Sequence, residues 1–148
     1  MDYEPLKQTL MTIVPFNRHV GIEILDIGPG TASVRLPEGP HLMNHVRTQH
    51  AAALFAAAEA ASGGAMAGAF AELMMGVTPL ARSAQIAYLK PARGPITANA
   101  RVAEDHDAVR ARLGAAGKTD FSVDVDLVDG QGVKVAEVTV AWHIRKNA

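Results

Sequence analysis

The sequence predicts an α+β domain in which one long helix packs against an antiparallel sheet. One stretch, from residue 48 to about residue 71, is long, rich in alanine and helical in character. Around it lie shorter segments in which apolar and polar residues alternate, as they do in half-buried strands. Short connections between these segments favour antiparallel pairing over parallel crossovers. One helix against one such sheet makes a two-layer domain.

Composition indicates one domain over residues 1–148 and excludes several functions. Of the 148 residues, 49% are hydrophobic and 20% are charged, which is enough to bury a full core. The net charge of −1 shows no basic excess, so nucleic acid is not an expected partner. Cysteine is absent, which excludes disulfides, thiolate metal ligands and a cysteine nucleophile and suits a cytoplasmic protein. The first residues lack the basic and apolar regions of a signal peptide.

A short helix and a hairpin are expected before the long helix. Apolar residues at helical spacing predict the short helix, and Pro15 ends it. Two alternating segments on either side of Gly28-Pro29-Gly30 are typical of a hairpin. The expected bounds are residues 4–13 for the helix, 21–27 and 31–36 for the strands, and 37–47 for a loop.

The long helix is expected from Thr48 to about Ala71. Half of its residues are alanine, the best helix former, and such small side chains allow a sheet to approach closely. Gly63-Gly64 is a weak point, where a bend or an end of the helix is expected. The segment is long enough to cross a bilayer, but it is mostly Ala and Gly and contains Glu59. A buried helix is therefore favoured over a membrane span.

The second half of the chain is expected to form about four strands. Phe121, Val123, Val125 and Leu127 alternate with polar residues, as in a strand with one buried face. Residues 108–116 are expected to form one or two helical turns. The expected strands are residues 82–89, 95–102 and 121–127, with a last strand that contains residues 138–144.

The candidate catalytic residues lie within residues 44–61, where a polar loop leads into the long helix. A helix N-terminus offers free backbone N–H groups and the positive end of the helix dipole, which can stabilise an oxyanion. Glu59 places a carboxylate in an otherwise apolar helix, where a charge is costly unless it is paired or serves a function. His41, His45 and His50 have no acidic residue at ligand spacing, so no metal site is expected.

Each of these residues also has a purely structural interpretation. The sequence leaves open a solvated surface position for Glu59. It also leaves open an ordinary loop or capping role for Asn44 and a structural role for His50.

The spacing of Asn44, His50 and Glu59 resembles that of the hotdog-fold acyl-CoA thioesterases. Those proteins carry N-x-x-G-x-x-H-G-G ahead of the helix and an acid nine residues after the histidine. The segment 88–94, Tyr-Leu-Lys-Pro-Ala-Arg-Gly, resembles the end of one of their strands. The likeness extends from about residue 16 to residue 145. It is closest to the phenylacetic-acid-degradation type and to a neighbouring thioesterase-like group, and it implies a sheet wrapped around one central helix.

The resemblance implies an acyl-CoA thioesterase that releases a free acid and CoA, with no metal or bound cofactor; CoA arrives as part of the substrate. The N–H of Ala51, or of Ala52, would polarise the thioester carbonyl. Glu59 would act as general base or nucleophile, and Asn44 would orient the water or the carbonyl. Further candidates are His50 and Gln49 at the mouth, Leu54, Phe55, Met66, Met74 and Met75 around the acyl group, and Arg82, Ser83, Lys90 and Arg93 for the rest of the substrate.

The chain departs from the thioesterase pattern at three places. The two glycines after the histidine are Ala51 and Ala52, which keep their N–H groups and leave less room for a thioester. The glycine three residues after the asparagine is Arg47. A Thr or Ser early in the third strand has no clean equivalent among residues 81–83.

The proposed roles of Ala51 and Glu59 require two chains. The residues are eight positions apart, which corresponds to about 12 Å along a helix. A glutamate side chain does not cover that distance and also reach the same carbonyl. The N-terminus of the helix is therefore expected from one subunit and Glu59 from its partner in a two-fold dimer. The resemblance to hotdog thioesterases implies a homodimer or a dimer of dimers.

The sequence leaves three rival functions open. One is a hotdog dehydratase or hydratase that uses His50 and Glu59, and another is a non-catalytic protein that binds acyl-CoA or lipid. A purely structural module is third. The sequence does not predict the acyl group or the pathway.

Overall fold

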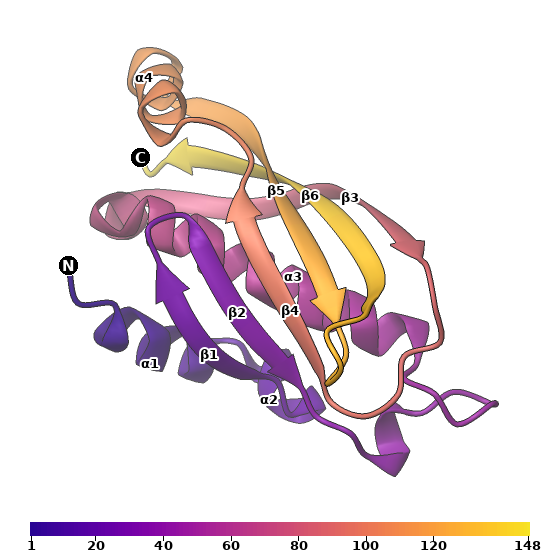
Figure 1. Ribbon diagram of the computed structural model, residues 1–148. Helices are drawn as coiled ribbons and strands as arrows, with labels where there is room; N and C mark the ends of the chain where they lie inside the picture. Colours follow the sequence, from indigo (N-terminus) through magenta and orange to yellow (C-terminus); the bar gives the residue numbers. More distant parts are fainter.

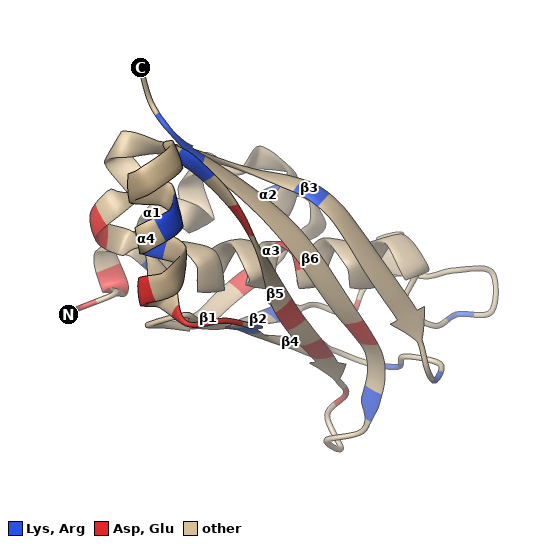
Figure 2. Cartoon of the chain, turned by 90° about the horizontal axis from the view of Figure 1, so that it is seen from above, with Lys and Arg blue, Asp and Glu red and all other residues tan.

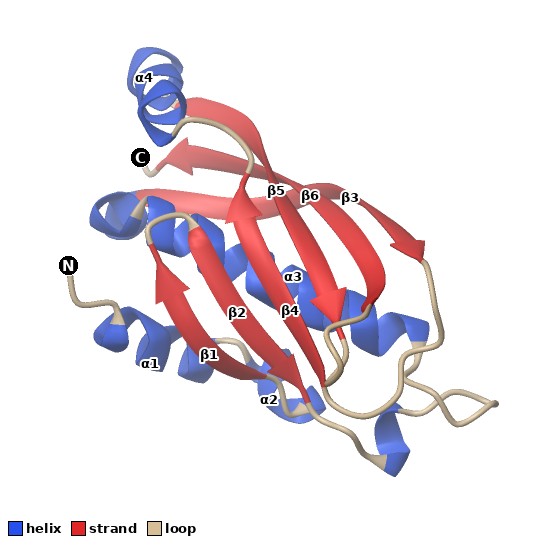
Figure 3. Cartoon of the chain, viewed as in Figure 1, coloured by secondary structure: helices blue, strands red, loops and turns tan.

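A six-stranded antiparallel sheet forms one layer of the protein, and a long helix, α3 (Ala51–Ala69), lies against it (Figure 1; Figure 3). The computed structural model describes residues 1–148. The strand order is β1-β2-β4-β5-β6-β3, and all neighbours are antiparallel. The strands are β1 (Glu23–Gly28), β2 (Thr31–Leu36), β3 (Val77–Tyr88), β4 (Ile96–Val102), β5 (Lys118–Val128) and β6 (Lys134–Lys146). The predicted α+β class, a sheet wrapped around one central helix, is confirmed.

The N-terminal helix α1 (Glu4–Ile13) has the expected bounds, but a second helix, α2 (Pro15–Val20), follows it and was not predicted. Pro15 ends α1 and at the same time begins α2. Proline suits the first turn of a helix because the N–H that it lacks would have no partner there. Gly21, with φ of 90°, ends α2.

Helix α3 begins three residues later than expected, at Ala51, because His50 is extended and forms the N-cap. The helix does not end at Gly63-Gly64, one of the two outcomes expected there, since α3 runs through both glycines without interruption. A Cβ at Gly64 would lie 2.9 Å from the Ala32 Cβ. A Cβ at Gly68 would lie 2.1 Å from the backbone oxygen of Gly28. These glycines let α3 approach the β1–β2 hairpin.

Three other elements are longer than the sequence suggested. β5 extends over residues 118–128 instead of 121–127. β3 begins at Val77 instead of Arg82, and α4 (His106–Ala116) extends the one or two expected turns. α4 is bounded by an Asp105 cap and by Gly117, with φ of 75°. It sits at the end of the sheet near the C-terminus (Figure 1). Short 3₁₀ turns, η1 (Pro40–Leu42) and η2 (Ala71–Gly76), occupy the flanks of α3.

The two edges of the sheet differ in what covers them. β1 contacts α1 and α3, whereas β3 lies at the other edge, beside β6. From Leu80 to Tyr88, every residue of β3 except Ile86 is exposed. An edge strand of this length presents unpaired N–H and C=O groups to another strand.

None of the helices combines the length and the apolar character that crossing a membrane requires.

Candidate functional site

A tight loop, residues 43–49, leads into α3 and is closed by the side chain of Asn44. Its Oδ1 accepts hydrogen bonds from the backbone N–H groups of Val46 and Thr48, each at 3.0 Å. Its Nδ2 donates to Thr48 Oγ1 at 2.7 Å. Both lone pairs of Oδ1 are therefore used, and one N–H of Nδ2 is left for a ligand. Asn44 holds the loop in shape and can still donate one hydrogen bond.

Arg47 lies at the tip of this loop in a left-handed conformation. Its φ is 64°, and no other non-glycine residue of the chain has a positive φ. A side chain makes this conformation unfavourable, while glycine adopts it freely. The thioesterases that the sequence resembles carry glycine at this position, and the backbone geometry gives the reason.

Gln49 anchors the loop to the body of the protein. Its side-chain amide donates to the backbone oxygens of Pro37, at 2.9 Å, and Gly94, at 3.0 Å. Gln49 is 5% exposed, and its Oε1 has no hydrogen-bond partner. A buried acceptor without a partner costs free energy, so Gln49 offers an unused acceptor beside the loop.

His50 caps α3 and decides which backbone N–H groups are free. The N–H of Ala52 donates to His50 Nδ1 at 2.9 Å. A backbone N–H only donates, so Nδ1 carries the lone pair and Nε2 carries the proton. The N–H of Ala51, in contrast, forms no hydrogen bond, and Ala51 is exposed. Of the two alanines, Ala51 therefore supplies the free donor at the helix N-terminus.

Glu59 lies two turns into α3, partly buried, and its carboxylate forms no hydrogen bond or ion pair. Burial raises the pKa of the Glu59 carboxyl above its ordinary value. Behind it, the indole N–H of Trp142 donates to Ser62 Oγ at 3.0 Å, and this hydroxyl donates to the Glu59 backbone oxygen at 2.7 Å. This buried chain joins β6 to α3 at the position of Glu59.

Two adjacent hollows lie on either side of Tyr88, whose hydroxyl donates to the Ala51 backbone oxygen at 3.1 Å. We name them the loop hollow, of about 390 Å³, and the helix hollow, of about 620 Å³. The loop hollow is lined by Asn44, Val46, Thr48, Gln49, Ala51, Leu54 and residues 88–92. The helix hollow is lined by Phe16, His50, Ala51, Ala52, Phe55, Ala56, Glu59 and Tyr88. Ala51 and Tyr88 belong to both.

The candidates suggested for the acyl group divide between these places. Leu54 and Phe55 line the hollows, and Met66 is buried further along α3. Met74 packs against the core from η2, and Met75 is 95% exposed at the end of η2.

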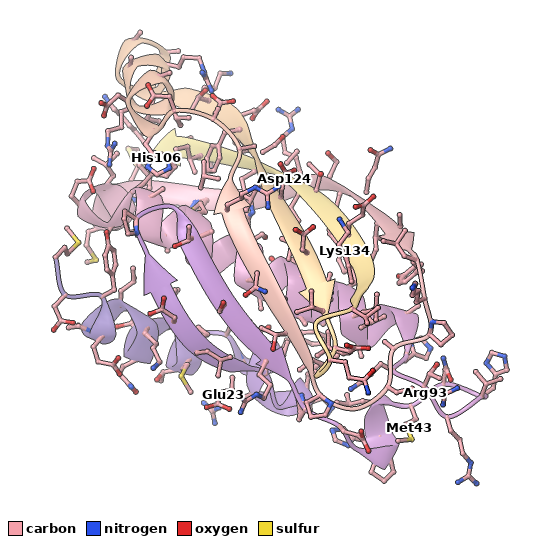
Figure 4. The ribbon with its side chains drawn as sticks, viewed as in Figure 1. Glu23, Met43, Arg93, His106, Asp124 and Lys134 are labelled. Carbon is pink, nitrogen blue, oxygen red and sulfur yellow. The ribbon has the colours of Figure 1, made fainter.

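The basic candidates do not gather in one place. Lys90 lines the loop hollow, and Arg93 is exposed at the same end of the molecule as Met43 (Figure 4). Arg82 instead lies on the sheet face opposite α3, where it contacts Asp120 Oδ2 at 2.8 Å. His143 Nδ1 lies 2.6 Å from the other oxygen of Asp120, and this contact, with help from Arg82, lowers the pKa of the carboxyl. Ser83, next to Arg82, is exposed on β3.

Nothing in the structure forms a metal site of the usual kind. No three side chains of His, Cys, Asp or Glu lie together in a way that could hold an ion.

The model of a domain of unknown function, DUF4442, matches residues 4–144. The chain belongs to this family. None of the curated proteins compared with it matches in sequence.

Solved structures resemble this DUF4442 protein over nearly its whole length. A protein of unknown function from Pseudomonas aeruginosa, described as a probable thioesterase, has a TM-score of 0.85 at 25% identity and covers 99% of this chain and 97% of its own. The E. coli PaaI protein from the phenylacetic acid degradation operon has a TM-score of 0.76 at 22% identity, over 95% and 91%. A Chlorobaculum tepidum protein of unknown function reaches 0.85 at 19%, over 97% and 94%. These likenesses confirm the hotdog fold and the resemblance found in the sequence.

Two residues that line the hollows, Phe16 and Tyr88, were not predicted from the sequence to be site residues. Phe16 lies in α2, the helix that was not predicted, and is 61% exposed. Tyr88 ends β3 and is 50% exposed. Neither position carried a signal in the sequence, because tertiary packing decides which hollow a side chain lines.

Proposed function

We propose that this protein is an acyl-CoA thioesterase whose active site is shared by two copies of the chain. One observation carries the proposal. Ala51, whose N–H is free, and Glu59, whose carboxylate is unpaired, both line the helix hollow on one unbroken helix. They are a donor for a developing oxyanion and a group able to take a proton from water.

In the proposed reaction, the Ala51 N–H of one subunit donates to the thioester carbonyl oxygen. The Glu59 carboxylate of the other subunit takes a proton from a water molecule, whose oxygen attacks the carbonyl carbon. The C–S bond then breaks, CoA leaves as the thiolate and takes the proton back from Glu59. The products are the free acid and CoA. The remaining N–H of Asn44 Nδ2 donates to the water or to the carbonyl oxygen.

Two copies are needed because α3 is continuous from Ala51 to Glu59. Helical rise separates the two residues by about 12 Å along the axis. The exposed edge of β3 supports the pairing, since an antiparallel contact between two β3 strands would join the sheets and cover Tyr88 and Leu80, which are exposed.

The CoA portion would lie over the loop hollow. Arg47, Lys90 and Arg93 are exposed and form no ion pair. Basic segments mark the loops at this end in Figure 2. Unpaired cations of this kind suit the phosphates of CoA. Arg82, already bound to Asp120, is a weaker candidate.

The similarity to a Pseudomonas protein described as a probable thioesterase supports this assignment. The hydratase alternative is less favoured. There a histidine has to accept a proton, and His50 Nδ1 is occupied by the Ala52 N–H while Nε2 already carries a proton. An acyl-CoA-binding protein without activity remains the outcome if no turnover is seen.

The test is the release of free CoA from acyl-CoAs of short, medium, long and aryl type. Wild-type protein is compared with Glu59→Gln, and Glu23→Gln on β1 serves as the matched control. We expect Glu59→Gln to lower kcat by at least about two orders of magnitude. Equal rates in Glu59→Gln and wild type would overturn the mechanism, and binding without turnover would leave an acyl-CoA carrier.

A further inference from the structure

A third hollow, of about 220 Å³, continues from Glu59 along α3 and plays no part in the chemistry above. Glu59, Gly63 and Met66 of α3 form its floor. Leu10, Ile13 and Val14, at the end of α1, form its far wall. We call it the α1 chamber. Glu59 belongs both to this chamber and to the helix hollow.

The lining of the α1 chamber is mostly apolar. Besides α1 and α3, it includes the buried side chains of Ile24 and Trp142. Glu59 and Asn17 carry the polar atoms of its rim, and no charged residue other than Glu59 faces it. A chamber of this chemistry takes an apolar group and rejects a charged one.

The position of the chamber identifies which part of a thioester it would hold. Glu59 is the group that acts on the water next to the carbonyl carbon. The CoA portion leaves this point toward the loop hollow, which the other subunit contributes. The acyl group is then the part that continues past Glu59 between α3 and α1.

We propose that the α1 chamber holds the acyl tail and selects linear, medium-length chains of about eight carbons. This inference rests on the proposed thioesterase function. Glu59 and Met66 are seven residues apart, which corresponds to about 10 Å along α3. An extended chain advances about 1.2 Å per bond, judged from the span of an extended polypeptide, so eight carbons reach Met66. The volume also exceeds the roughly 150 Å³ of a dry cavity that admits benzene.

Gly63 sets the depth of the chamber. It lies one turn beyond Glu59, and its missing side chain leaves the floor open. A Cβ there would lie 3.6 Å from the Trp142 ring, an ordinary van der Waals contact. Alanine at this position is therefore compatible with the fold, and a larger side chain would block the chamber about 6 Å beyond Glu59.

The experiment measures kcat/KM for acyl-CoAs from two to sixteen carbons in wild type, Gly63→Ala and Gly63→Leu. In wild type we expect about a fourfold rise per methylene up to about eight carbons, from the transfer energy of a buried methylene, and no rise beyond. Gly63→Leu is expected to lower the octanoyl-to-butyryl ratio at least tenfold, and Gly63→Ala by about fourfold. Gly114→Ala in α4, where a Cβ meets nothing within 4 Å, is the matched helix-glycine control and should leave the ratio unchanged.

Binding separates this inference from the proposed function. The probes are the non-hydrolysable thioethers S-octyl-CoA and S-butyl-CoA, measured by calorimetry. Hydrolysis with an unchanged chain-length profile in Gly63→Leu overturns the chamber and leaves the thioesterase. No hydrolysis, together with tight S-octyl-CoA binding that Gly63→Leu weakens, supports the chamber and overturns the thioesterase. A preference for phenylacetyl-CoA over octanoyl-CoA contradicts the linear chain.

Discussion

The backbone N–H of Ala51 is the smallest feature on which the proposed chemistry depends. The side chain there is alanine, yet the useful group belongs to the backbone, and so glycine is not required for it. His50 takes the N–H of Ala52 and leaves that of Ala51 free. One capping histidine thus selects the donor.

Ala51→Pro removes this donor while keeping the helix. Proline suits the first position of a helix, and His50 already has the extended conformation, φ −63° and ψ 142°, that a residue before proline prefers. We expect kcat to fall by about 10²–10³ with a circular dichroism spectrum like that of wild type. Ala51→Gly keeps the N–H and should retain activity, and a fully active Ala51→Pro would exclude this donor.

Glu59 gives a pH dependence whose sign follows from its burial. Burial raises the pKa of the Glu59 carboxyl in the folded protein. Its contribution to stability is therefore fully present at pH values below the ordinary glutamate pKa, and it is lost as the pH rises through the raised pKa. Glu59→Gln carries no charge, and its free energy of unfolding relative to wild type should therefore be higher at pH 7 than at pH 4. Urea unfolding at the two pH values measures this difference, and no change with pH would mean that the carboxyl titrates normally.

The pKa of the acidic limb of the kcat/KM profile should likewise lie above the ordinary glutamate pKa, because the base must be ionised.

At the scale of elements, the loop before α3 contains a residue whose type does not suit its backbone conformation. Asn44 and Gln49 tie residues 43–49 into one shape, which forces Arg47 to φ of 64°. A strained residue beside a candidate site is held there by the hydrogen bonds around it.

Arg47→Gly relieves the strain. We expect the free energy of unfolding to rise by about 1 kcal/mol and Tm by about 2–4 °C. Arg47→Ala removes the same charge but keeps the Cβ, so it should not gain this stability. If both variants bind acyl-CoA more weakly than wild type, the guanidinium contributes to the CoA site as well; equal stability of all three proteins would show that the loop is not strained.

At the scale of the whole molecule, the exposed β3 edge and the distance between Ala51 and Glu59 lead to the same conclusion. A single chain leaves an unpaired strand on one side and an incomplete site on the other. A two-fold dimer through β3 would complete both, with two sites for each dimer.

Mixing two inactive variants tests this arrangement. Ala51→Pro and Glu59→Gln subunits, unfolded together and refolded, should form heterodimers in which one of the two sites is intact, with about a quarter of wild-type activity. Each variant refolded alone supplies the baseline. No recovery in the mixture, with subunit exchange verified by mass, would place both residues in a site within one chain.

The sequence by itself determined the class, the helix at the centre and the spacing of Asn44, His50 and Glu59. These depend on local patterns: alanine content, alternation and the distance along the chain. The second helix at Pro15, the continuity of α3 through Gly63-Gly64 and the exposed aromatics Phe16 and Tyr88 were decided only by tertiary structure. A proline that ends one helix and starts the next, or a glycine that permits close packing, has the same local signal as a break. The same is true of the free N–H of Ala51, since it depends on where α3 begins, and the helix begins at Ala51 because His50 is extended.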